Sequence, residues 1–168
     1  MIRLKQAAAA VLMTAALTTA SGADTFEVYG EVEGWTIYAD NGNLSCLIEA
    51  VDSSENVVQM GLTEDRSVGY LGVFVKGETE IENGNTEAVA ILIGENIYLG
   101  EATGMRSRIT EGYTGGYVTS DNPNFVKDIE QQYQMIVFPE TNYSFVVDLR
   151  GTKKAIAMAR ECNAALIN

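Results

Sequence analysis

The 168-residue sequence contains no histidine, only two cysteines, and 11 basic against 23 acidic residues. Without histidine the chain cannot form a Ser–His or Cys–His nucleophile pair or a histidine-bearing metal site. Two cysteines do not complete a zinc site by themselves. No segment has the spacing of either standard glycine-rich phosphate loop. We therefore predict no catalytic residue of these classes, no metal and no cofactor.

The first 23 residues have the pattern of a secretory signal peptide. Arg3 and Lys5 supply the positively charged start, and a short apolar run followed by small residues completes the pattern. An uncleaved membrane anchor is the alternative, but the apolar run is shorter than the roughly 20 residues that span a bilayer. We expect residues 1–23 to be removed and residues 24–168 to form a single exported, periplasmic domain.

The charge of the chain restricts its partners. Removing the signal peptide, which carries two basic residues and no acid, changes the net charge from −12 to −14. Such a surface repels nucleic acid and anionic lipid. We therefore expect no nucleic-acid partner and no stable membrane insertion after cleavage.

Cys46 and Cys162 are the only two cysteines, and they predict a structural disulfide. In an exported chain two cysteines most often pair. The bond would close a loop of more than a hundred residues and stabilise the fold by roughly 4–5 kcal/mol in the chain-entropy account. The alternative, a reactive thiol, needs a basic or histidine neighbour, and the chain has no histidine.

Short apolar runs separated by turn residues predict a mainly β domain of about eight strands, an antiparallel sandwich or a barrel-like sheet. Asn41-Gly42 is the strongest hairpin signal, because both residues tolerate positive φ. The apolar run at 70–75 is almost continuous and predicts a central strand. The segment 100–116 is rich in glycine, which predicts short or bulged strands there.

Two helices are expected beside the strands. Apolar residues at four-residue spacing predict a short helix near 122–133, capped by Asp121 or Asn122. The last helix is predicted to begin with Thr152 as its cap and to carry Cys162 on its buried stripe.

The ending F-x-V-x-L-x-G-T-x-x-A-I-x-x-x-x-x-C, from Phe145 to Cys162, resembles a C-terminal signature of small alphaproteobacterial periplasmic proteins related to the invasion-associated locus B family. The similarity extends to the signal peptide and to the stretch from Trp35 to Cys46. The resemblance implies an envelope protein in which a strand, a turn and a helix close a β-rich domain. It implies no catalytic residues.

A first candidate site lies at the start of the last helix and comprises Arg150, Thr152, Lys153 and Lys154. Two lysines in a first helical turn oppose the helix dipole, which prefers acids there. Together with Arg150 and the free N–H groups of the turn they are predicted to bind an anion or a partner. The alternative is that both lysines point into water.

A second candidate site comprises Arg106, Arg108, Tyr113 and Tyr117. Arginine and tyrosine on a glycine-rich segment are typical of contact patches in protein interfaces. Tyrosine is also an ordinary strand residue, so cross-strand packing is the alternative interpretation.

Two further chemistries remain open at this point. The 23 acids include candidates for a hydrolytic carboxylate pair, but the sequence identifies none of them. Oxygen-rich segments at 40–43 and 82–85 suggest calcium ligands, although polar turns explain both and neither has EF-hand spacing. We expect an exported, non-catalytic envelope protein that binds another envelope protein or a small anionic ligand. The alternatives are an acid-dependent hydrolase and a purely structural envelope component.

Overall fold

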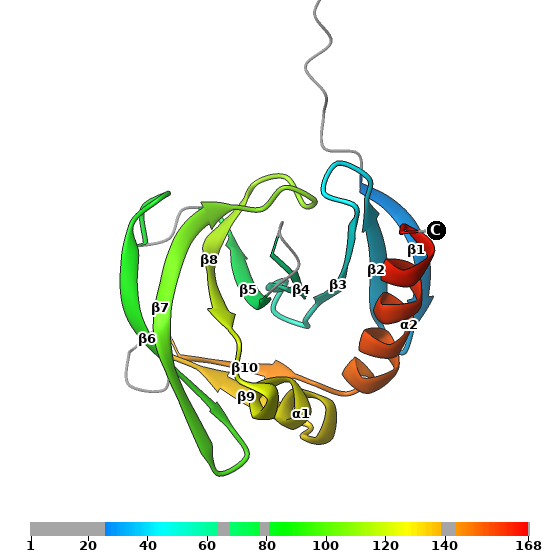
Figure 1. Ribbon diagram of the computed structural model, residues 1–168. Coiled ribbons are helices and arrows are strands. Elements are labelled where there is room, and N and C mark those ends of the chain that lie inside the picture. Colours follow the sequence, from blue (N-terminus) through cyan, green and yellow to red (C-terminus); the bar gives the residue numbers. More distant parts are fainter. Residues whose placement is uncertain (1–25, 64–67, 78–80, 139–143, 168) are drawn as a thin grey trace, which may run out of the picture.

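The computed structural model describes residues 26–63, 68–77, 81–138 and 144–167, so the expected signal peptide lies outside the described residues. Within these ranges the chain forms ten strands and two helices (Figure 1). The elements are β1 (Phe26–Val32), β2 (Trp35–Asp40), β3 (Ser45–Val51), β4 (Val57–Leu62), β5 (Gly69–Lys76), β6 (Thr86–Ile93), β7 (Asn96–Arg106), β8 (Tyr113–Ser120), α1 (Pro123–Gln131), β9 (Gln134–Val137), β10 (Phe145–Asp148) and α2 (Thr152–Ala165).

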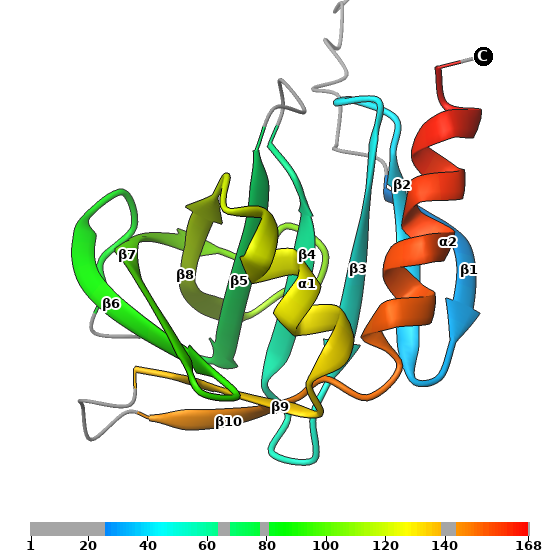
Figure 2. The ribbon, with the colours of Figure 1, turned by 60° about the horizontal axis from the view of Figure 1, so that its bottom comes forward.

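The strands form one antiparallel sheet in the order β1-β2-β3-β4-β5-β8-β7-β6-β9-β10. The sheet curls but does not close, because β1 and β10 remain its two edges. Figure 2 shows β9 and β10 running across one end of the central strands. In the same view α1 lies in front of β4 and β5. The mainly β prediction is confirmed, and β5 is central as expected. The chain has ten strands rather than about eight.

The glycine-rich segment 100–116 does not form short or bulged strands, as its composition suggested. It contributes most of β7, which has 11 residues, and the first half of β8. Its glycines allow close approach instead: a Cβ on Gly115 would lie 2.0 Å from the carbonyl oxygen of Val73, and one on Gly104 would lie 2.3 Å from that of Glu82. The absence of a side chain at Gly104 and Gly115 therefore lets the backbone at Glu82 and Val73 come close to β7 and β8, while both strands stay regular.

The tight turn with two positive φ angles, which the sequence predicted for the β2–β3 hairpin, is found in the β1–β2 hairpin instead. The tight two-residue turn with positive φ at both positions occurs at Glu33 (φ 50°) and Gly34 (φ 86°). The β2–β3 hairpin predicted at Asn41-Gly42 does form, but its left-handed residue is Leu44 (φ 49°). Its first turn is held by a side chain, because Asp40 Oδ1 accepts hydrogen bonds from the N–H groups of Gly42 and Asn43.

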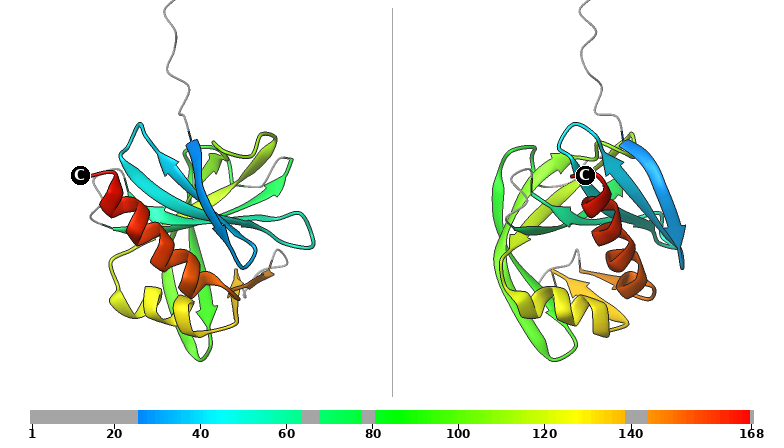
Figure 3. Two further views of the ribbon diagram at one scale, coloured as in Figure 1. Left: turned by 90° about the vertical axis from the view of Figure 1, so that its right-hand side faces the viewer. Right: turned by 45° about the vertical axis from the view of Figure 1, so that its right-hand side comes forward.

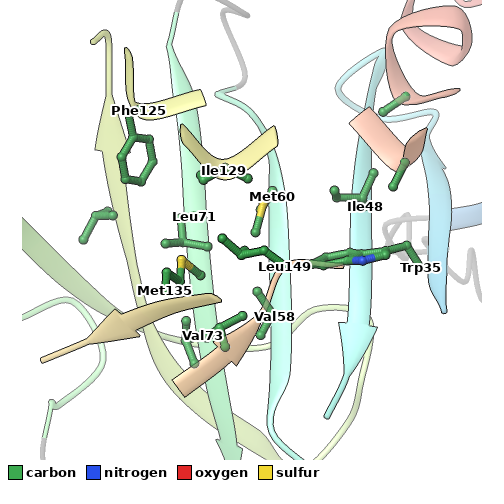
Figure 4. Packing of buried hydrophobic residues seen from close by; sticks show 14 of the residues in the cluster. Trp35, Ile48, Val58, Met60, Leu71, Val73, Phe125, Ile129, Met135 and Leu149 are labelled. Atoms are coloured by element: carbon green, nitrogen blue, oxygen red, sulfur yellow. The ribbon is translucent and has the colours of Figure 1, made fainter. Parts of the chain in front are cut away.

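The main hydrophobic core lies between one face of the curled sheet and the layer formed by α1, α2, β9 and β10 (Figure 4). We call this side of the sheet the core face. Alternate residues of each strand point to it, as the two-residue period of a strand requires. The residues labelled in Figure 4 all belong to it: Trp35, Ile48, Val58, Met60, Leu71, Val73, Phe125, Ile129, Met135 and Leu149.

Helix α1 begins where the sequence predicted. Asn122 is its N-cap and its side chain accepts a hydrogen bond from the N–H of Asn124. The helix buries Phe125 and Ile129 and ends at Gln131, two residues before the predicted end. Among the described residues no helix is long and apolar enough to cross a membrane.

The cap of α2 is Gly151 rather than Thr152, which corrects the sequence prediction. Gly151 has φ +84°, and a Cβ at this position would lie 2.7 Å from Glu33 Cβ. Only glycine meets both conditions without strain. Thr152 is 1% exposed, and its hydroxyl lies 2.9 Å and 2.7 Å from the carbonyl oxygens of Ile129 and Leu149, so it joins α1 to the end of β10.

Helix α2 lies along β1, β2 and β3 (Figure 3) and is fixed to them at both ends. Near its start the indole N–H of Trp35 donates to the carbonyl oxygen of Arg150 over 2.9 Å. Near its end Cys162 is bonded to Cys46 with a Cα–Cα distance of 6.1 Å, which confirms the predicted disulfide. The bond leaves β3 from the core face, and it fits an oxidising, exported location.

A candidate binding cleft on the second face of the sheet

The opposite side of β3, β4 and β5, which we call the second face, is also covered in part. The covering element is the β7–β8 loop, residues 107–112, which arches over the sheet at the top of Figure 1. Thr110 Oγ1 donates to Glu49 Oε1 over 3.2 Å, and Gln59 Nε2 lies 3.4 Å from Ser107 Oγ. Two side chains of the loop are therefore anchored on two neighbouring strands.

Beside this loop lies a cleft of about 390 Å³. Its walls mix aromatic, aliphatic and polar side chains from β1, β2, β3, β4, β5, β7, β8 and the β7–β8 loop. The lining residues are Phe26, Asp40, Asn43, Ser45, Leu47, Gln59, Leu62, Thr63, Tyr70, Met105, Arg108, Ile109 and Tyr117. This size and this mixture are typical of small-molecule sites, which are mostly apolar with a few placed polar groups.

Glu49 lies under the β7–β8 loop and is only 5% exposed. Its Oε2 accepts a 2.6 Å hydrogen bond from Gln59 Nε2, and its Oε1 accepts the bond from Thr110. Burial raises the pKa of the Glu49 carboxyl above its usual value, and the two hydrogen bonds offset that effect in part. Glu49 contacts a lining residue, Gln59, but does not itself line the cleft.

Asp40 lines the cleft at the end of β2 and is 4% exposed. Besides the two backbone bonds to Oδ1, its Oδ2 accepts a 2.8 Å bond from Asn43 Nδ2. These are the contacts of a polar turn, the alternative that we set against a calcium site at 40–43. Among the described residues no three His, Cys, Asp or Glu side chains are grouped so as to hold a metal ion.

Tyr70 forms one wall of the cleft by lying across Gly61 of the neighbouring strand. A Cβ on Gly61 would lie 2.9 Å from Tyr70 Cε1 and 2.9 Å from Leu47 Cβ, so the ring occupies the space that a side chain would need. Burial raises the pKa of the Tyr70 phenol, and the nearby Asp40 carboxylate raises it further, while the Arg108 guanidinium lowers it. The phenol therefore stays neutral and presents an uncharged ring.

Arg108 extends from the β7–β8 loop over the ring of Phe26, with 5.7 Å from its guanidinium carbon to the ring centroid. This is the geometry of a cation–π contact. Of the contact patch predicted from the sequence, Arg108 and Tyr117 line the cleft, whereas Arg106 and Tyr113 do not. Two of the four residues of that patch therefore line the cleft.

The predicted anion site at the start of α2 has a different environment. Arg150 forms an ion pair and three side-chain hydrogen bonds with Asp148, and holds the pKa of that carboxyl below its usual range. Lys154 pairs with Glu33, and Thr152 is buried. Lys153 is exposed. Two of the three cations expected to attract an anion therefore already contact carboxylates of the chain.

A smaller cavity of about 210 Å³ lies on the core face between β3, β4, α1 and α2. Its lining is mainly apolar and includes Met60, Phe125 and Ile156, with Arg160 at its side. Arg160 forms a 2.8 Å ion pair with Glu130, which links the two helices. The lining of this core-face cavity contains none of the residues that the sequence indicated as a binding site. We therefore treat the second-face cleft as the candidate site.

Sequence reasoning missed most of this environment, including Phe26, Glu49, Gln59 and Tyr70. A signal was present for two of them, because Glu49 and Gln59 each stand between apolar residues inside a mainly apolar strand. They are paired across β3 and β4. What the sequence alone does not give is the fold of residues 107–112 over this pair.

Comparisons with protein-family models, with curated proteins and with solved structures gave no match for this chain. The resemblance of its C-terminal segment to proteins related to invasion-associated locus B therefore stays a prediction.

Proposed function

We propose that this protein is an exported, non-catalytic binding protein of the cell envelope, resident in the periplasm, and that the second-face cleft is its binding site. The observation that carries the proposal is the cleft itself. It combines a volume of about 390 Å³ with aromatic walls and several polar side chains. A face that served only to stabilise the fold would not need these features together.

Export is supported by three independent features. The disulfide between Cys46 and Cys162 fits an oxidising compartment. Residues 1–23 have the charge and apolar pattern of a signal peptide. The C-terminal segment resembles that of envelope proteins. The periplasm is the location that the resemblance favours.

The raised pKa of Glu49 is the one observation that favours the alternative, an acid-dependent hydrolase. A carboxylate pair needs both acids to face the same substrate. Here Asp40 faces the cleft but is bonded to its own turn, and Glu49 is bonded to Gln59 and Thr110 without lining the cleft. Binding without catalysis is the better supported function.

The test is a small-molecule screen by protein-detected NMR on the mature, oxidised protein. Tyr117→Ala removes a ring from the cleft wall, whereas Tyr113→Ala removes a ring from the same strand outside it. We expect a bound compound to lose about ten-fold in affinity in the first variant and to keep it in the second. Equal affinity in both variants would move the site away from the cleft, and turnover of the compound would favour the hydrolase.

A further inference from the structure

We infer that the second-face cleft selects a small organic cation, a primary ammonium or guanidinium group carried on an apolar body. The inference rests on the proposed function, because it requires the cleft to be the binding site. It also changes the expected sign of the ligand charge, since the sequence alone suggested a small anionic ligand.

The first support is the aromatic lining. Phe26, Tyr70 and Tyr117 come from three different strands and line one cleft. The face of an aromatic ring attracts a cation, and sites built from several rings bind ammonium groups in this way. The Tyr70 phenol is neutral at physiological pH, and burial raises its pKa further, so its ring brings no charge of its own.

The second support is the charge around the cleft. The acid that lines it is Asp40, which is more than nine-tenths buried. Among the described lining residues Arg108 is the one basic side chain. The chain as a whole carries a net charge of −12, which attracts cations and repels anions over longer distances.

The third support is the position of Arg108 itself. Its guanidinium already lies over the Phe26 ring, so the cleft holds a cation of the kind that we infer, supplied by the chain. A cationic ligand would share the aromatic walls with Arg108 or take its place.

The volume of the cleft sets the size of the ligand. A cavity of about 150 Å³ accommodates benzene. The cleft, at about 390 Å³, is large enough for one ring with a short charged arm. Benzylamine, benzyl alcohol and benzoate are therefore suitable probes, because they share one ring and differ mainly in charge.

The experiment is an NMR titration of the mature, oxidised protein with each of the three probes. We expect affinity to fall in the order benzylamine, benzyl alcohol, benzoate, with shifts at the backbone amides of the cleft residues. Equal affinity for the amine and the alcohol, or tighter binding of benzoate, would overturn the inference while leaving the cleft as a binding site. No shift with any probe would overturn the inference and would also count against the proposed function.

Asp40→Asn is the decisive variant, because the amide keeps an oxygen to accept the two backbone bonds of the turn, while the charge and the bond from Asn43 Nδ2 are lost. We expect it to weaken benzylamine binding by about ten-fold. Asp52→Asn is the matched control, since Asp52 Oδ1 accepts from Ser54 and Asn56 in a similar polar turn outside the cleft.

Arg108→Gln is a second test, because we expect this variant to change the affinity for a cation and for an anion in different directions. If the ligand is a cation, removing the guanidinium leaves benzylamine affinity unchanged or increases it. If the ligand is an anion, the same variant weakens benzoate binding. Weaker benzylamine binding in Arg108→Gln together with unchanged binding in Asp40→Asn would overturn the inference.

Discussion

The core face and the second face of the central strands are formed by alternate residues of the same strands, but they differ in how polar their buried residues are. On β3, Ile48 points to the core face and is 1% exposed, while Leu47 points to the second face and is 7% exposed. The core face is almost wholly apolar. The second face carries four of the buried polar residues, Asp40, Ser45, Glu49 and Gln59, together with the cleft.

This difference separates stability from function within one sheet. Burying an acid costs free energy even when it is hydrogen-bonded, so Asp40 and Glu49 are poor choices for stability alone. The core face carries the disulfide and the two covering helices, while the second face also buries the apolar pair Val57 and Phe74 away from the cleft. We therefore expect changes on the core face mainly to affect unfolding and changes to the cleft residues mainly to affect binding.

The largest expected effect concerns the disulfide. Replacing both Cys46 and Cys162 with alanine opens a link between residues 116 positions apart. We expect the free energy of unfolding to fall by up to about 4–5 kcal/mol, as the chain-entropy account gives for loops of this length. Urea unfolding of the double variant, with the oxidised wild-type protein as control, measures it. A loss below about 1 kcal/mol would mean that packing alone holds α2 on the sheet.

The second prediction compares the two faces directly, through one pair of adjacent residues. Ile48 is 1% exposed and borders the apolar core-face cavity, so Ile48→Ala enlarges that cavity, and we expect it to cost about 3–4 kcal/mol of unfolding free energy. Leu47→Ala removes a side chain from the wall of an open cleft, where no closed cavity results, so we expect about 1–2 kcal/mol. Urea unfolding of both variants at one pH measures the difference.

Leu47→Ala and Ile48→Ala should also differ in their effect on ligand affinity. In conditions where both variants are folded, Leu47→Ala should change the affinity of a cleft ligand, because Leu47 lines the cleft. Ile48→Ala should not, because Ile48 lies on the other face. Equal unfolding costs and equal affinities in the two variants would contradict the division between the faces.

Much of the fold could be predicted from the sequence, because it depends on local patterns. Asn122 was one of two residues expected to cap α1, and the apolar stripe of the last helix placed Cys162 on its buried side. The errors arose where tertiary contacts override local preference. Gly151 replaced Thr152 as the cap of α2 because Glu33 and the positive φ leave no room for a side chain.

The candidate site was less accessible to sequence reasoning. Arg108 and Tyr117 were identified as part of a patch, but nine of the thirteen lining residues come from positions 26–70, far earlier in the chain. Only the fold brings Phe26, Asp40 and Tyr70 beside them. Local patterns carry no information on which loop crosses which strands, so the cleft could not be foreseen.

The smallest expected effect is the pH dependence that Glu49 gives to stability. Its pKa in the folded protein is raised above the usual value of 4.5, mainly by burial. The folded state therefore holds the Glu49 proton more tightly than the unfolded state does. This contribution to stability is complete below about 4.5 and is lost as pH rises through the folded pKa.

Glu49→Gln removes the titrating group but keeps side-chain atoms that can bond Gln59 and Thr110. We expect its stability to decline less than that of the wild-type protein as pH rises from below 4.5 towards neutrality, with a difference smaller than either core effect above. Urea unfolding of both proteins across this range measures it, with Asp52→Asn as a control for the loss of one acid. Parallel curves of unfolding free energy against pH would mean that the pKa of Glu49 is the same in the folded and unfolded states. Burying this carboxylate would then cost the fold no free energy.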